Sequence, residues 1–77
     1  MRKASYKKLW KLLIDRDMNK KMLAEAAHLS LSSLTKLTKG QTVNVEILIK
    51  ICNALNCEMW DIMELIEQEV VVNGAEN

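Results

Sequence analysis

The chain has 77 residues, which allow one small domain and leave little room for a separate catalytic apparatus. With 49% hydrophobic residues and a net charge of +1, it is too apolar and too weakly charged to be disordered. No apolar run is long enough to cross a bilayer, and the basic N-terminus lacks the apolar core of a signal peptide. We therefore expect a cytoplasmic protein without a membrane segment.

The charge is divided unevenly along the chain. Residues 1–40 contain ten Lys or Arg and three Asp or Glu, a net +7, whereas residues 41–77 contain one and seven, a net −6. A basic half in a nearly neutral domain is typical of a face that binds a polyanion, although a solvated surface can have the same composition.

The spacing of apolar residues predicts an all-α fold of five helices. Four of them have a residue at their start that can accept a hydrogen bond from the first turn, namely Ser5, Asn19, Ser30 and Asn44. Gly40 follows the third helix, where a left-handed backbone ends many helices. The predicted helices span residues 5–16, 20–27, 31–39, 45–55 and 58–69.

The fifth predicted helix ends the domain. Trp10 and Trp60 both fall on apolar stripes, so both are expected to anchor the core. The residues after this helix, Val70–Val72, fit either a short strand or a frayed end, and we assign 1–69 to the domain and 70–77 to a tail. The inner face of the fifth helix is expected to consist of Met59, Trp60, Met63 and Ile66.

The cysteines and the single histidine do not support a metal site or a catalytic centre. Two cysteines, Cys52 and Cys57, are too few for a disulfide framework, and one His leaves a four-ligand zinc site remote. We expect both thiols to be reduced, with Cys52 as a small core residue. The chain also has no nucleophile–His–acid arrangement and no glycine-rich phosphate loop, so we predict no enzyme, no metal and no cofactor.

The second and third predicted helices are joined by a turn of about three residues, which is the arrangement of a helix-turn-helix unit. Ala24 stands where the two helices approach most closely and where a small side chain is needed. The positions that hold the helices at a steep angle are all apolar: Leu23, Ala27, Leu29, Leu34 and Leu37.

Residues 19–40, together with the fourth predicted helix, resemble the lambda-repressor-like, or Cro/C1-type (XRE-like), helix-turn-helix regulators. The resemblance covers about residues 5–66. Three features depart from the family pattern. His28 replaces the usual glycine of the turn and is expected to adopt a left-handed backbone, and Lys20 replaces a frequent glutamine. Leu13 and Thr38 stand where the family often pairs an Arg with a Glu, so packing is expected to replace an ion pair.

The resemblance implies a sequence-specific regulator of double-stranded DNA, of bacterial or phage type and acting as a repressor, with residues 31–39 in the major groove. It also implies a homodimer, which we expect to form through the fifth helix and Val70–Val72. No small-molecule ligand is expected. The implied base-reading residues are Leu31, Ser32, Ser33 and Lys36, and the implied phosphate-binding residues are Asn19, Lys20, Thr35, Lys39, Gln41 and Asn44.

Two questions stay open from the sequence. Lys7, Lys8 and Lys11 fit an extension of the DNA footprint as well as they fit a solvated helix face. The same fold also fits a protein-interaction module, such as an antitoxin-like partner, that uses Leu31 and the acidic fifth helix as its contact surface.

Overall fold

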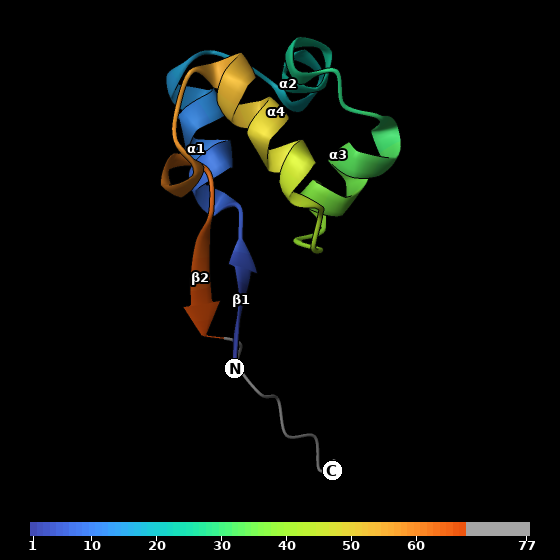
Figure 1. The fold of residues 1–77 in the computed structure, drawn as a ribbon. Helices are drawn as coiled ribbons and strands as arrows, with labels where there is room; N and C mark the ends of the chain where they lie inside the picture. Colours follow the sequence, from blue (N-terminus) through green and yellow to red (C-terminus); the bar gives the residue numbers. More distant parts are fainter. Residues whose placement is uncertain (68–77) are drawn as a thin grey trace.

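The computed structural model describes residues 1–67 and contains four helices, one turn of 3-10 helix and a two-stranded sheet (Figure 1). The helices are packed together, and the sheet extends from the helical part next to the start of the first helix. The elements are β1 (Arg2–Ser5), α1 (Lys7–Asp15), α2 (Lys20–Ala27), α3 (Leu31–Thr38), α4 (Val45–Leu55), η1 (Met59–Asp61) and β2 (Glu64–Glu67).

The core is formed by apolar residues from all four helices, with Tyr6 before α1 and Ile62 after η1. Full burial of a leucine or isoleucine stabilises the fold by roughly 1.5–3 kcal/mol, so these residues supply much of the driving force for folding. The buried hydrophobic residues are Tyr6, Leu9, Leu13, Leu23, Ala27, Leu37, Leu48, Ile51, Leu55 and Ile62.

Three of the predicted helix starts are confirmed. The side chains of Asn19, Ser30 and Asn44 each accept the backbone N–H of the residue three positions later, at 2.8, 3.1 and 3.1 Å. The predicted start of the first helix at Ser5 is wrong. Ser5 is the last residue of β1 and α1 begins at Lys7, although the hydroxyl of Ser5 does accept the backbone N–H of Lys7 at 3.4 Å.

Each of the four helices is followed by a residue with positive φ. These residues are Asp17, His28, Gly40 and Asn56, with φ values of 55°, 56°, 71° and 53°. After α3, for example, the N–H of Gln41 donates to the carbonyl of Lys36 at 2.8 Å, which satisfies an acceptor that the helix leaves free. The left-handed backbone predicted for His28 is therefore confirmed.

The predicted helical fold is confirmed in part: residues 1–67 contain four of the five predicted helices, but the predicted fifth helix is not formed and a small two-stranded sheet is present. Residues 64–67 instead form β2, which pairs antiparallel with β1, and Lys3 lies opposite Ile66. Trp60, expected in the core, is 66% exposed, while the neighbouring Ile62 is fully buried. The predicted strand or frayed end at Val70–Val72 lies outside the described residues.

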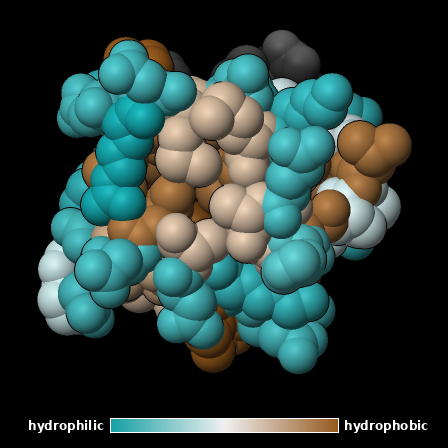
Figure 2. Space-filling model, turned by 90° about the horizontal axis from the view of Figure 1, so that it is seen from above, coloured by the Kyte–Doolittle hydropathy of each residue, from teal (hydrophilic) through white to brown (hydrophobic). Residues whose placement is uncertain are grey.

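One end of the helical part carries small apolar side chains at its surface. Figure 2 shows hydrophobic atoms in the middle of this face, framed by hydrophilic side chains. A cleft of about 300 Å³ between α2 and α4 is lined by the alanines 26, 27 and 54, together with His28, Lys50 and Asn53. This cleft holds one cationic lysine, in contrast to the more basic surroundings of α1 and α3 described below.

Candidate nucleic-acid interface

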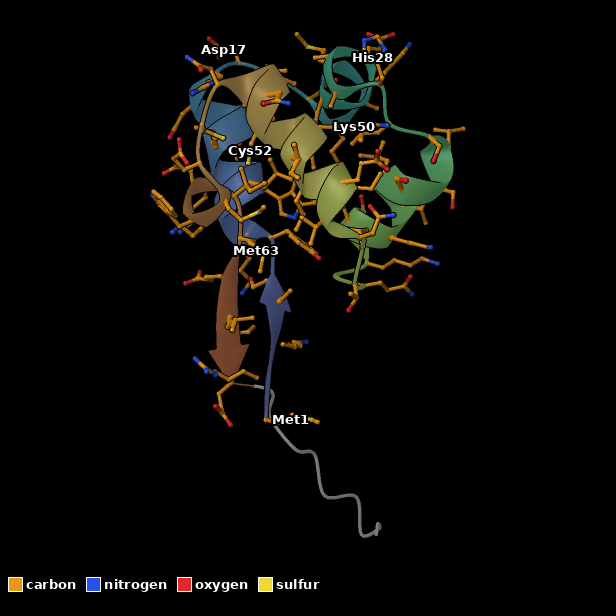
Figure 3. The ribbon with its side chains drawn as sticks, in the orientation of Figure 1. Met1, Asp17, His28, Lys50, Cys52 and Met63 are labelled. Atoms are coloured by element: carbon orange, nitrogen blue, oxygen red, sulfur yellow. The ribbon has the colours of Figure 1, made fainter. Side chains whose placement is uncertain are left out.

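The arrangement of α2 and α3 is set by the apolar residues that face the core. Leu23 of α2 and Leu37 of α3 are both fully buried, and Ala24 is half-buried where the two helices meet. His28 lies in the turn between the helices, as the labelled side chain in Figure 3 shows. Because its backbone is left-handed, the chain reverses sharply here and Ser30 can cap α3.

The face of α3 turned away from the core carries three of the four predicted base-reading residues. Leu31 is 80% exposed, and Ser32 and Lys36 are exposed as well. Ser33 is placed differently, because it is half-buried and its hydroxyl lies 3.1 Å from the hydroxyl of Ser30. The structure thus brings Leu31, Ser32 and Lys36 to one surface and turns Ser33 towards the start of the helix.

Two predicted phosphate-binding residues, Asn19 and Asn44, sit at helix starts. Each uses its Oδ1 atom to cap its helix, which leaves the Nδ2 amide group without a hydrogen bond in residues 1–67. The free N–H groups of the first turn and the helix dipole favour an anion at both places. These two helix starts can therefore hold an anion with side-chain and backbone donors together.

Thr35, Lys39 and Gln41 are the other exposed predicted contacts, on α3 and directly after it. Thr35 shares the outward face of α3, whereas Lys39 and Gln41 lie on either side of Gly40. The turn at Gly40 places their side chains near the end of α3, where a cationic and an amide group can donate to a ligand.

Lys20 makes a contact that the sequence did not predict. Its ammonium group lies 4.6 Å from the centre of the Trp10 ring, in a cation–π geometry. Trp10 is half-buried, so the expectation of a core anchor holds for part of its ring only. No local pattern could have shown this pair, because the two residues stand on different helices.

The two cysteines are free thiols near the end of α4. Partial burial raises the pKa of both thiols, and that of Cys57 reaches about 11, with the neighbouring Cys52 adding to the shift. At neutral pH both groups are therefore protonated, which makes them poor nucleophiles and poor metal ligands.

Within residues 1–67, His, Cys, Asp and Glu side chains do not gather in groups of three or more that could hold a metal ion. Over the same residues, the structure contains no helix long and apolar enough to span a membrane.

Together, the two helices, their capped turn and the exposed face of α3 define a helix-turn-helix DNA-binding domain. Residues 8–68 match the family described as the Cro/C1-type HTH DNA-binding domain. The chain therefore belongs to this family, as its resemblance predicted.

A solved structure supports the same assignment. The chain is similar to the transcriptional regulator VanUg, whose crystal structure it matches with a TM-score of 0.84 and 48% sequence identity. The similarity covers 87% of this chain and 89% of that one. A comparison with curated proteins gave no match.

Proposed function

We propose that this protein recognises a specific sequence in double-stranded DNA by placing α3 in the major groove, and that it represses transcription by occupying an operator. The observation that carries the proposal is the outward face of α3, where Leu31, Ser32 and Lys36 are exposed while Leu37 fixes the helix to the core. A rigid helix with an exposed polar face fits the major groove in width and in hydrogen-bonding capacity.

The three exposed residues suit different base edges. Lys36 can donate to the acceptors of guanine, Ser32 can donate or accept at any base pair, and Leu31 can pack against a thymine methyl group. Ser33 contributes less to this proposal, because its hydroxyl is engaged with Ser30. Since none of these side chains has the planar fork of Arg, Asn or Gln, DNA shape and bridging water must supply part of the specificity.

In this proposal, phosphate contacts hold the domain in register. The amides of Asn19 and Asn44 donate to the backbone from the starts of α2 and α4, with Lys20 beside the first of them. Lys20 then exchanges the ring of Trp10 for a phosphate. The remaining proposed phosphate contacts are Thr35, Lys39 and Gln41.

The first test is selection of binding sites from a random duplex pool at roughly physiological salt, read by sequencing. The proposal expects an enriched motif. No enrichment, from protein shown by circular dichroism to be folded, would contradict specific DNA recognition. Transcription in vitro from a promoter that overlaps the motif then tests repression, with unchanged transcription arguing against it.

A matched pair of variants tests the role of α3. Lys36→Gln removes a charge from the proposed base-reading face, and Lys50→Gln removes the same charge from the cleft between α2 and α4. We expect Lys36→Gln to change the preferred base at one position and to weaken binding by about 1–3 kcal/mol. Lys50→Gln should leave the motif unchanged, and equal effects of the two would count against readout by α3.

We further propose that the protein binds as a homodimer through the chain that follows α4. The expected helix is absent from residues 58–67, but Trp60 and Leu65 are 66% and 53% exposed and supply apolar surface. A symmetric dimer would place its two recognition helices about 34 Å apart, one turn of DNA. The enriched motif should then contain two inverted half-sites about 10 base pairs apart.

Sedimentation at increasing protein concentration tests the dimer. Leu65→Ser should shift the protein towards monomer, whereas Ile14→Ser, a matched change at an exposed site on α1, should not. A wild-type protein that stays monomeric at every concentration, and selects a single half-site, would exclude the homodimer.

One observation favours a second candidate function, a protein-interaction module. A cleft of about 520 Å³ between α2 and α3 is lined by four apolar residues, Ala24, Leu29, Leu31 and Leu34, with Lys21, Glu25 and His28 beside them. It reaches the exposed Leu31 and could receive an apolar side chain of a partner. A folded protein that selects no DNA sequence would favour this function over DNA recognition.

A further inference from the structure

A second basic surface lies outside the helix-turn-helix unit. A cleft of about 310 Å³ opens between β1, the start of α1 and the end of α3. Each of these three segments contributes one lysine to its wall, namely Lys3, Lys7 and Lys39. Chain segments far apart in the sequence thus bring three cationic side chains to one hollow.

Among residues 1–67, no carboxylate lines the wall of this cleft to neutralise the lysines. The nearest acidic positions along β2 are Glu64, which pairs with Ser5 in the sheet, and Glu67, which accepts the N-terminal ammonium group at 2.8 Å. Neither lines the cleft. In addition, α1 has no acidic residue in its first turn, and only its first N–H, that of Lys7, donates to a side chain (Ser5 Oγ, 3.4 Å), so its other N–H groups add to the positive potential.

The cleft is continuous with the proposed phosphate contacts. Lys39 belongs to both, and Trp10, which carries Lys20 over its ring, also lines the cleft. The ring of Trp10 therefore links the start of α2 to the cleft. A duplex bound along α3 and the start of α2 would continue past this hollow.

We propose that this cleft binds a backbone phosphate of the same duplex that α3 reads, so that the DNA footprint extends over β1 and the start of α1. This inference rests on the proposed DNA binding and enlarges it. It also assigns different roles to the lysines of α1: Lys7 lines the cleft and is expected to contact DNA there, whereas Lys8 and Lys11 do not line it.

Salt-dependent binding to a labelled 30-base-pair duplex of mixed sequence tests the inference, because phosphate contacts do not require the operator. Lys3→Gln and Lys7→Gln should each make the fall of log K with log salt less steep, by at most about 0.9 because the cleft binds one phosphate. At 0.1 M salt each should therefore weaken binding by up to about eightfold, which follows from the same slope.

The matched control is Lys8→Gln. It removes the same charge from the next residue of α1, whose side chain is turned about 100° around the helix from that of Lys7. Its slope should stay within experimental error of the wild-type slope. Circular dichroism and thermal unfolding of each variant show whether the fold is intact.

The outcomes are distinct. If the wild type binds the duplex but Lys7→Gln and Lys8→Gln change the slope equally, the cleft holds no phosphate and DNA binding itself still stands. If Lys3→Gln and Lys7→Gln both leave the slope unchanged, the inference is also overturned. If folded wild-type protein binds no duplex even at low salt, the proposed function fails and the inference fails with it.

Discussion

The residues that end the four helices all adopt a backbone conformation that L-amino acids avoid, yet only one of them is glycine. Asp17, His28 and Asn56 are among the residue types that tolerate positive φ best. Sequence reasoning identified two of these ends with their cause, at His28 and Gly40, because a break in an apolar pattern coincides with a suitable residue.

Gly40 allows the cost of this conformation to be measured. A Cβ atom added at Gly40 would meet no atom within 4 Å, so the strain of substitution comes from the backbone alone. We expect Gly40→Ala to lower the free energy of unfolding by about 1 kcal/mol and Gly40→Asn to lower it by less. Urea denaturation measures both, and an equal loss for Ala and Asn would contradict the backbone explanation.

Trp10 should report DNA binding directly. In a Trp60→Phe variant it is the remaining tryptophan of the chain, and the Lys20 ammonium group lies over its ring. If Lys20 moves to a phosphate, the indole loses its cation and its fluorescence emission should shift when DNA is added. The same titration with Lys20→Gln should give a smaller change, and identical changes would mean that Lys20 does not move.

Cys57 should make stability depend on pH in the alkaline range. Burial raises its pKa from 9.0 to about 11 in the folded protein, so the folded state keeps a proton that the unfolded state releases first. This contribution to stability is complete below pH 9 and is lost as the pH rises towards 11. Between pH 8 and 11, the urea midpoint of unfolding should fall less steeply with pH in Cys57→Ala than in the wild type. Parallel midpoint curves for the two proteins would contradict the raised pKa of Cys57.

At the level of elements, the helices were predictable and the sheet was not. Three helix starts carry a capping residue three positions before the N–H it accepts, which is a local signal. The strand β1 has the sequence Arg-Lys-Ala-Ser, which gives no alternation of apolar and polar residues. Its pairing with β2 depends on residues about sixty positions away, and a local pattern cannot show such a contact.

The segment after α4 was assigned to a helix because Met59, Met63 and Ile66 have helical spacing. The structure places the buried side chain at Ile62 instead and leaves Trp60 exposed. Ile62→Ala should therefore lower the free energy of unfolding by about 2–4 kcal/mol, the usual cost of emptying a core site.

Trp60→Ala provides the comparison, because it removes a larger side chain from an exposed position. We expect a loss below about 1 kcal/mol for this variant. Thermal or urea unfolding of the two proteins measures the difference. A larger loss for Trp60→Ala than for Ile62→Ala would support the helical stripe and contradict the arrangement of η1 and β2.

At the level of the whole molecule, the charge division along the sequence anticipates which end of the chain carries the proposed interface. The basic residues 1–40 include α2, α3 and the three lysines that line the cleft between β1, α1 and α3. The individual residues of the surface were harder to foresee. Helical spacing predicts which residues lie on the outward face of α3. It does not predict that Ser33 is half-buried or that Lys20 lies over Trp10, because both depend on packing between helices.

Glu46 tests this electrostatic division from the acidic side. It lies in the first turn of α4, next to the proposed phosphate contact at Asn44. Glu46→Gln should strengthen DNA binding about two- to fivefold at physiological salt, because it removes a repulsion within a screening length of the backbone.

The control for this change is Glu58→Gln. Glu58 lies beyond the opposite end of α4, about 16 Å along the helix axis and farther than charges act at physiological salt. Equal strengthening by both variants, measured by fluorescence anisotropy, would show that net charge alone governs binding.

The pairing of β1 with β2 also has a consequence for the order of folding. During synthesis, β1 leaves the ribosome first, and its partner strand follows about sixty residues later. The helices form through local contacts in the meantime, whereas closure of the sheet must bring together the two ends of a long loop. The helix-turn-helix unit is thus expected to assemble before the sheet. The lysine-lined cleft between β1, α1 and α3 is then completed last, because its wall includes β1.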